Sequence, residues 1–181
     1  MNFEFYPNIA VLEKDLGGSK QTALNKKNYA KAEEGWNKLS SEELAYINQA
    51  ATTAVKVMNS YVTPGYILHM AGKVFYVIPV RDLVWMYTTT VTQRMYFIPY
   101  NKMHSLNVVD RTGEIYTLGT MNTGGFSKKT PAADAMQQIT DIILPQRPGM
   151  ILGWSEEISK AVSENFVGVV QSVDARCAGV Q

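Results

Sequence analysis

The sequence predicts an α+β protein in which an antiparallel β-meander of about five to seven strands is flanked by N-terminal helices and two C-terminal helices. Two changes of period along the chain predict this class. Apolar side chains recur at three- and four-residue steps up to about residue 60, at two-residue steps over 60–119, and at helical steps again after 130. We expect residues 1–59 to form a helical segment that packs on the sheet and residues 60–181 to form the α+β domain, together as one structural unit.

Composition and charge place the chain among ordinary globular proteins. Of its 181 residues, 46% are hydrophobic and 18% are charged, which excludes extensive disorder. A chain of this length buries roughly two thirds of the surface that it exposes when unfolded, so it needs no metal or disulfide to fold. The net charge of +1, from 17 basic and 16 acidic residues, predicts no nucleic-acid partner, because no broad electropositive face is expected.

Three features bear on the location of the protein. The single cysteine, Cys177, has no CxxC or CxH neighbour, so we interpret it as a structural thiol in a reducing compartment. The first residues lack the basic and apolar segments of a signal peptide. The longest uncharged stretch, Val57–Gly72, is interrupted by Pro64 and His69 and cannot span a bilayer as a helix. We therefore expect no transmembrane segment in this chain and a cytoplasmic location, with the inner face of the membrane as the alternative.

The N-terminal region is predicted to be helical. Gly17-Gly18-Ser19 is a break, and a polar segment follows over Lys20–Lys38. Ser40-Ser41-Glu42-Glu43 is a capping box, in which the Ser40 hydroxyl accepts from the Glu43 amide at the start of the next helix. The apolar stripe of that helix is predicted to consist of Leu44, Ile47, Ala51, Ala54, Val55 and Met58.

The middle of the chain is predicted to be the meander. Ala71-Gly72-Lys73 is a tight hairpin turn, and Asp110-Arg111-Thr112-Gly113 is a type I turn with glycine placed for positive φ. Leu83–Val91 is apolar on both faces, which is typical of a central strand that is covered twice. A five-residue motif occurs twice, as Tyr76–Val80 and as Tyr96–Tyr100, with a proline in each copy. We interpret Pro79 and Pro99 as strand ends, because proline donates no ladder hydrogen bond. The expected strands are Tyr66–Met70, Val74–Ile78, Leu83–Val91, Arg94–Ile98, Met103–Val109 and Ile115–Leu118.

The C-terminal region returns to helical spacing. One helix is bounded by prolines and has an apolar stripe, a short apolar strand follows, and a second helix leads into the tail. The tail is left open between a strand and a continued helix. These segments are the loop Asn122–Lys129, the helix from Thr130-Pro131 with stripe residues Met136, Ile139, Ile142 and Ile143, the terminating Pro145 and Pro148, the strand Met150–Leu152, the helix from Ser155 to about Phe166, and the tail Val167–Gln181.

No catalytic set is recognisable in the sequence. With only His69 and His104 in the chain, histidine-based catalysis and histidine-rich metal sites have few candidate residues. His104 shares strand parity with Leu106 and Val108, so we interpret it, like His69, as a hydrogen-bonded structural residue. A small hydrolase that uses His104 with Asp82 is kept as an alternative. The sequence predicts no cofactor and no metal.

The best candidate for a binding site is the loop before the first C-terminal helix, together with nearby aromatic and basic residues. A glycine-rich loop at a helix N-terminus favours an anion, but the spacing of the Walker phosphate-binding loop is absent. Tyr96 and Phe97 are adjacent, so we expect them on opposite faces of a strand and not in one stacking platform. The predicted ligand-binding residues are Tyr100, Lys102, Gly124, Gly125, Ser127, Lys128 and Lys129.

The segment from Tyr61 to Tyr87 contains the run Ile78-Pro79-Val80-Arg81-Asp82-Leu83-Val84-Trp85-Met86-Tyr87. It resembles an uncharacterised bacterial domain family, common in gut Firmicutes, whose sheet carries an I-P-x-x-D-[IL]-x-W-x-Y strand. The likeness covers roughly residues 60–166 and includes the Asp110–Glu114 hairpin and Gly153-Trp154-Ser155. It implies a fold similar to bacterial pleckstrin-homology-like domains, a sheet that bends over a C-terminal helix, and it implies no activity.

These observations predict a non-catalytic binding or interaction module. Its partner is expected to be a protein, a peptide or a lipid headgroup, bound through a sheet edge or a loop. One alternative is a structural role, as a homodimer or as a component of a membrane-linked complex. The other alternative is the hydrolase named above.

Overall fold

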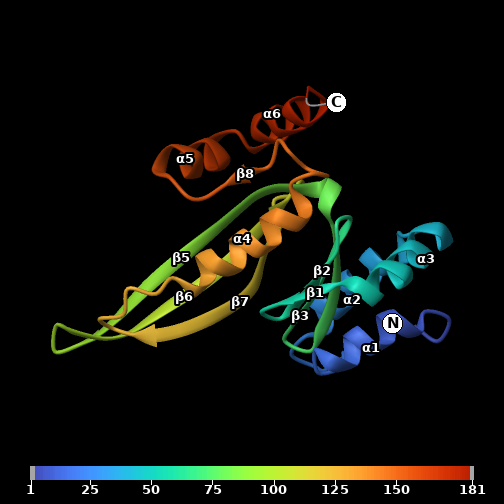
Figure 1. The fold of residues 1–181 in the computed structure, drawn as a ribbon, viewed down its shortest axis with the longest axis horizontal. Helices are drawn as coiled ribbons and strands as arrows, with labels where there is room; N and C mark the ends of the chain where they lie inside the picture. Colours follow the sequence, from blue (N-terminus) through green and yellow to red (C-terminus); the bar gives the residue numbers. More distant parts are fainter. Residues whose placement is uncertain (1–2, 180–181) are drawn as a thin grey trace. The chain divides into compact units, whose positions relative to one another are not determined.

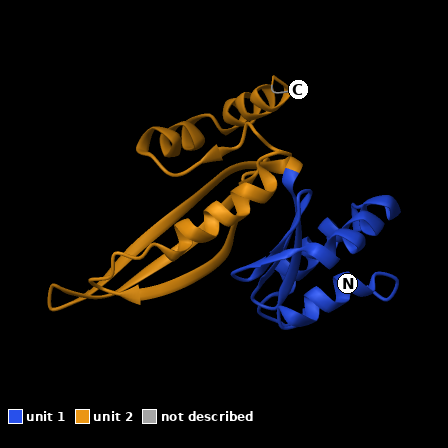
Figure 2. Cartoon of the chain, viewed as in Figure 1, with its two compact units in different colours: residues 1–80 blue, residues 81–181 orange. Residues whose placement is uncertain are grey.

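The computed structural model describes residues 3–179 and confirms the α+β class. The described chain contains six α-helices and eight strands, and the strands form two mostly antiparallel sheets. The chain folds as two compact units, residues 1–80 and residues 81–181 (Figures 1 and 2). Each unit has its own sheet and its own helices.

Unit 1 is a four-stranded meander covered by three helices. The strands pair in the order β1-β2-β3-β4, and every pair is antiparallel. The helix α2 packs on β4, and α1 packs on α3. The elements are α1 (Pro7–Asp15), α2 (Lys26–Asn37), α3 (Ser41–Ala50), β1 (Val55–Val57), β2 (Ser60–Val62), β3 (Tyr66–Ala71) and β4 (Val74–Pro79).

Aromatic side chains dominate the core of unit 1. Trp36 of α2 stacks on Phe75 of β4 with ring centroids 5.3 Å apart, and Phe3 meets the edge of both rings. The Trp36 indole Nε1 donates to the Phe75 carbonyl at 2.9 Å, so the one polar group of this buried ring is satisfied. The buried residues of this core are Phe3, Ile9, Leu12, Trp36, Ile47, Ala51, Tyr66, Leu68, Met70 and Phe75.

Two local predictions in unit 1 are confirmed. The Ser40 hydroxyl accepts from the Glu43 amide, and the Glu43 carboxylate accepts from the Ser40 amide, which completes the capping box at the start of α3. The β3–β4 hairpin turns at Gly72 and Lys73, whose φ values are 55° and 63°. This left-handed pair matches the right-handed twist of the two strands.

The helix α3 ends earlier than the sequence predicts. It stops at Ala50, so the prediction that the helical stripe continues to Met58 is wrong. The hydroxyls of Thr52 and Thr53 donate to carbonyls of the last helical turn, an arrangement that competes with helix continuation. The β-branched residues that follow then pair with β2 as the strand Val55–Val57.

The single predicted meander is divided between the two units. The boundary predicted near residue 60 differs from the boundary of the compact units, which lies between Val80 and Arg81. The strands β1–β4 belong with the N-terminal helices because their apolar residues build the same core. Tyr66, Leu68 and Phe75 are the clearest examples, since they cluster with residues of α1, α2 and α3.

Unit 2 contains the second sheet and three helices. Its strands lie in the order β7-β6-β5-β8, where the short β8 pairs parallel to β5 and the others are antiparallel. The helix α4 lies along one face of this sheet (Figure 1). The elements are β5 (Leu83–Met95), β6 (Ile98–Asp110), β7 (Ile115–Gly124), α4 (Pro131–Ile143), β8 (Ile151–Leu152), α5 (Glu156–Glu164) and α6 (Phe166–Ala178).

The longest pairing in the chain is the β5–β6 hairpin, and its turn is not where the sequence predicts it. Arg94–Ile98 was expected to be a strand, but Tyr96 and Phe97 form the turn with φ values of 49° and 68°. Pro99 accordingly lies at the start of β6 and does not end a strand, whereas Pro79 does end β4 as predicted. The error has a physical cause, because a left-handed two-residue turn normally contains Asn or Gly and not two aromatic residues.

The β6–β7 turn is confirmed. Gly113 has a φ of 83°, and its amide donates to the Asp110 carbonyl at 3.0 Å. The Asp110 carboxylate accepts from the amides of Thr112 and Glu114 at 2.8 and 3.1 Å. The aspartate therefore closes the turn with its side chain as well as its backbone.

The C-terminal helices form where predicted, and the structure decides the open question of the tail. The helix α4 begins at Pro131 and buries Ala132, Ala135, Ile139 and Ile143, whereas the predicted stripe residues Met136 and Ile142 are only half-buried. The helix α5 ends at Glu164 because Asn165 caps a new helix by accepting from the Gly168 amide at 3.0 Å. The tail is helical over Phe166–Ala178, and its last two residues lie outside the described range.

One buried arginine connects the start of β5 to α6. The Arg147 side chain is 8% exposed, its Nε donates to the Leu83 carbonyl at 2.9 Å, and its Nη2 meets the Asp174 carboxylate at 2.6 Å. Asp174 also contacts Arg111, which pairs with Asp82. This chain of charges joins the loop after α4, the first residue of β5 and the middle of α6.

We expect Arg147→Met to lower the free energy of unfolding of unit 2 by roughly 2–3 kcal/mol, measured by urea denaturation. The substitution keeps most of the side-chain volume but leaves the Leu83 carbonyl without its donor. Arg176→Met is the matched control, because Arg176 is exposed and bonds only within α6. An equal loss in both variants would contradict the role assigned to Arg147.

Candidate functional site

The residues predicted to bind a ligand lie together at one end of the second sheet. We name this end the distal arm and define it as residues 89–103 of the β5–β6 hairpin with residues 120–129 of β7 and the following loop. In Figure 1 it is the end of the β5–β7 sheet that points away from α5 and α6. Gly124 pairs with Asn101, and the Gly125 amide donates to the Tyr100 carbonyl at 3.1 Å. The Lys102 ammonium donates to the Ser127 carbonyl at 2.8 Å, which joins strand and loop.

Gly125 is required by the close approach of two backbones. A Cβ atom at this position would lie 2.0 Å from the Pro99 carbonyl oxygen, whereas a Cβ on Gly124 would meet nothing within 4 Å. Two loop amides have acceptors inside the loop: the Ser127 amide donates to the Gly124 carbonyl, and the Lys129 amide donates to the Ser127 hydroxyl. These two bonds help the loop to hold its shape.

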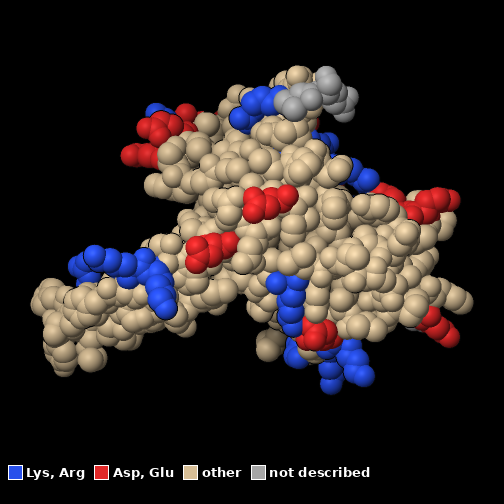
Figure 3. Space-filling view, viewed as in Figure 1, with Lys and Arg blue, Asp and Glu red and all other residues tan. Residues whose placement is uncertain are grey.

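The distal arm carries cations without nearby carboxylates. The sequence has no acidic residue between Leu83 and Val109 or between Ile115 and Ala133. In Figure 3, blue atoms gather on the arm, and no red atoms are visible at its end on this face. Within the described residues, none of the arm's four cations forms an ion pair. These cations are Arg94, Lys102, Lys128 and Lys129.

The tip of the arm is apolar and exposed. Tyr96 is 88% exposed and Phe97 is 94% exposed, and their neighbours Met95 and Ile98 are each about 60% exposed. We name these four residues the apolar tip. Sequence reasoning missed them because it placed Tyr96 and Phe97 inside a strand. The only local signal was the run of apolar residues, which is equally typical of a buried strand.

Polar cross-strand bonds, and not an apolar core, hold the arm together. His104 is buried as predicted, and its ring nitrogens lie 3.0 Å from the Thr90 hydroxyl and 2.9 Å from the Thr123 hydroxyl. The Asn101 amide donates to the Gln93 side chain at 2.8 Å. These pairs run across β5, β6 and β7 and allow the arm to extend where little apolar surface is buried.

The structure does not bring together the residues of the hydrolase alternative. Asp82 precedes the first residue of β5, and its carboxylate pairs with Arg111 at 3.1 Å. His104 pairs with Thr90, eight residues further along the strand, which is a separation of roughly 26 Å. Both ring nitrogens of His104 already contact threonine hydroxyls. The geometry therefore gives His104 no acid to orient it and no free nitrogen to act as a base.

His69 is a structural residue of unit 1. It is 1% exposed, and its Nδ1 lies 3.0 Å from the Ser60 hydroxyl and 3.2 Å from the Asn59 carbonyl. Its Nε2 is buried without a hydrogen-bond partner. Burial of the ring lowers the pKa of His69 from 6.5 to about 4, because the charged form loses its hydration.

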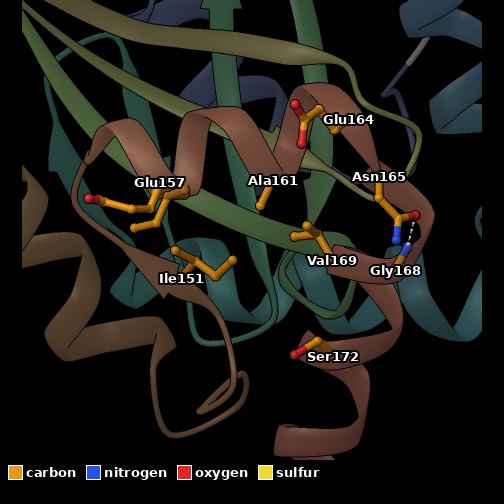
Figure 4. Close-up of a pocket in the computed structure, with 9 residues that line it drawn as sticks. Ile151, Glu157, Ala161, Glu164, Asn165, Gly168, Val169 and Ser172 are labelled. Atoms are coloured by element: carbon orange, nitrogen blue, oxygen red, sulfur yellow. Dashed lines mark hydrogen bonds between the residues drawn. The ribbon is translucent and has the colours of Figure 1, made fainter.

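A concave feature lies between α5, α6 and β8. It is an open groove of about 480 Å³ (Figure 4), with Ile158, Ala161 and Val169 among its apolar residues. Glu157 and Glu164 also line it, and the Asn165 side chain is engaged as the α6 cap. Neither histidine nor cysteine lines the groove. Across residues 3–179, no three His, Cys, Asp or Glu side chains are grouped to hold a metal ion.

We expect Gly125→Ala to lower the free energy of unfolding by roughly 1–3 kcal/mol, because the methyl group forces the loop away from Pro99. Urea denaturation measures this loss. Gly124→Ala is the matched control and is expected to change stability by less than about 0.5 kcal/mol. Equal stability of the two variants would show that the close approach at Gly125 is not needed.

We expect the buried His69 to make the protein acid-sensitive. Its folded-state pKa lies below the unfolded value, so the unfolded chain binds more protons and stability falls as the pH drops from about 6.5 to 4. The loss due to this residue is roughly 3 kcal/mol across that window. Urea denaturation at pH 7 and pH 4 measures it, and His69→Gln should reduce the difference. A ring-proton NMR titration of His69 with a midpoint near 6.5 would contradict the assignment.

No helix within residues 3–179 has both the length and the apolar character needed to cross a bilayer. Comparison of the chain with protein-family models, curated proteins and solved structures finds no match. The resemblance to a bacterial pleckstrin-homology-like family therefore stays a prediction. The function has to be argued from the distal arm itself.

Proposed function

We propose that the protein is a non-catalytic module that binds anionic lipid headgroups at a membrane surface through its distal arm. The observation that carries this proposal is the set of four cations on an arm, residues 89–103 and 120–129, that contains no acidic residue. Three of these residues, Lys102, Lys128 and Lys129, were predicted as ligand-binding residues, and Arg94 joins them through the β5–β6 pairing.

Charge arithmetic supports a weak and reversible attachment. Each Lys or Arg near an anionic membrane surface contributes on the order of 1 kcal/mol, and the contribution falls off within a Debye length. Four cations therefore favour binding by roughly 4 kcal/mol at low salt. Because the whole chain has a net charge of only +1, the attraction depends on how these four charges are grouped.

A lipid surface fits the arm better than nucleic acid or an acidic peptide. All three ligands supply anions for the cations. A bilayer also supplies an apolar phase directly behind its anions, and the apolar tip extends beyond Lys102 on the same hairpin. The proposal includes a location at the inner face of a membrane, because the cytoplasmic leaflet is the anionic one.

The structural alternative has one observation in its favour. The strand β8 pairs only with Trp85 and Met86, so within the described chain residues 87–95 of β5 have a partner on one side only. An unpaired strand edge of this length is a surface on which a second copy could add a strand and form a homodimer. Sedimentation velocity distinguishes this alternative by the mass of the protein in solution.

We expect the wild-type protein to co-sediment with vesicles that contain phosphatidylglycerol and not with pure phosphatidylcholine vesicles, and to bind more weakly at high salt than at low salt. The double variant Lys128→Glu/Lys129→Glu should bind at least about tenfold more weakly, because it reverses two charges at the surface. Its matched control is Lys26→Glu/Lys27→Glu, which makes the same change on the exposed start of α2.

The control variant should bind like the wild type. Binding to both vesicle types alike, or an equal loss in the two double variants, would contradict a site on the distal arm. Binding of a single-stranded oligonucleotide in place of vesicles would assign the same cations to nucleic acid.

A further inference from the structure

We infer that the apolar tip is an insertion anchor, which places the side chains of Tyr96 and Phe97 below the headgroups of the bilayer. This inference rests on the proposed function and adds a mode of binding to it. Cations alone would hold the protein at the surface, whereas an inserted tip would retain it when salt screens the charges.

The exposure of the tip is the first argument. Four consecutive apolar residues, 95–98, lie at the end of a hairpin, and Phe97 is 94% exposed. Among the described residues, no ring contacts Tyr96 or Phe97, and the Tyr96 hydroxyl has no hydrogen-bond partner. Single exposed apolar residues are common on proteins, but a contiguous exposed patch marks a surface that meets an apolar partner.

The backbone of the tip is the second argument. Tyr96 and Phe97 have φ values of 49° and 68°, a conformation that disfavours any residue with a Cβ atom. Asn-Gly would make the same turn at lower cost. Neither ring packs against the rest of the described chain, so the stability of the fold does not explain why Tyr96 and Phe97 occupy this turn. A strained backbone that presents two exposed rings is best explained by what the rings contact outside the chain.

The order of residues along the hairpin is the third argument. The apolar tip comes first. Arg94 pairs with Pro99 and lies two residue steps from the turn, which is roughly 7 Å along the hairpin. Interfacial segments bury their apolar groups by about 5–10 Å, so the Arg94 guanidinium would meet the phosphates when Phe97 is inserted. A tyrosine hydroxyl prefers the headgroup level, so the Tyr96 hydroxyl would lie near the phosphates when its ring is inserted.

The depth of insertion is limited by the turn itself. Its backbone groups leave the ladder at Tyr96 and Phe97, and unpaired backbone groups are not tolerated in the hydrocarbon core. The anchor is therefore shallow. It holds the arm at the interface and does not span the bilayer.

The experiment compares Phe97→Ser with Phe5→Ser on phosphatidylglycerol vesicles at low and high salt. Phe5 is 86% exposed and lies in unit 1, so it is the matched control for loss of an exposed ring. We expect Phe97→Ser to weaken binding by at least about tenfold and to remove the binding that persists at high salt. Phe5→Ser should bind like the wild type.

A direct measure of depth uses an environment-sensitive dye on Phe97→Cys in a Cys177→Ser background. Vesicles should shift its emission to the blue, and spin-labelled lipids should quench it. The same dye on Thr112→Cys, in the exposed β6–β7 turn, should do neither.

The outcomes separate the two proposals. If Lys128→Glu/Lys129→Glu abolishes vesicle binding while Phe97→Ser and the dye at position 97 show no effect, the anchor is wrong and headgroup binding stands. If the wild type binds no anionic vesicle, both are wrong. A third outcome is that the wild type binds no vesicle and sediments as a dimer, whereas Phe97→Ser sediments as a monomer. The tip is then a contact between two copies of the chain, and the anchor is overturned.

Discussion

The pairing of β5 with β6 is the constraint on which unit 2 depends. These strands pair from Leu83 opposite Asp110 to Met95 opposite Ile98, so one hairpin reaches from the buried end of the sheet to the exposed end. At the buried end, Val84 and Met86 lie in the apolar core, and Arg147 holds the first carbonyl of β5. Beyond Met86, β5 has no neighbouring strand on its β8 side within the described chain, because β8 pairs only with Trp85 and Met86. The ladder between β5 and β6 continues to the turn, since each pairing satisfies backbone N–H and C=O groups that would otherwise need water.

The arm shows how a sheet extends beyond its core. Where β5 is no longer covered, the side chains change from apolar residues to threonines, and cross-strand bonds to His104 replace apolar packing. Such bonds tolerate water on both faces, so the arm can project while the strands stay in register. A tip carried in this way can meet a partner without a rearrangement of the core. The same arrangement explains why a polar ring such as His104 can be buried: both of its nitrogens contact threonine hydroxyls on the neighbouring strands.

Features that depend on a few neighbouring residues agree with the sequence prediction. The Ser40 capping box, the Gly72-Lys73 turn and the Asp110 turn form as predicted, because each is specified by side chains within four residues of one another. Features that depend on distant partners do not. The segment Val55–Val57 carries part of a helical stripe but joins β2, and the expected single meander is two sheets, because the N-terminal helices bury β3 and β4 in a core of their own.

The candidate site divides in the same way. The sequence alone determined the α+β class and the grouping of Lys102 with the Gly124–Lys129 loop as a binding candidate. Only the tertiary structure decided that Tyr96 and Phe97 form an exposed turn, that His104 lies opposite Thr90, far from Asp82, and that the cations lie on the same arm as the apolar tip. The physical reason is that a run of apolar residues has the same pattern whether it is buried or exposed. Its burial is set by partners elsewhere in the chain, and at this tip the described chain supplies none.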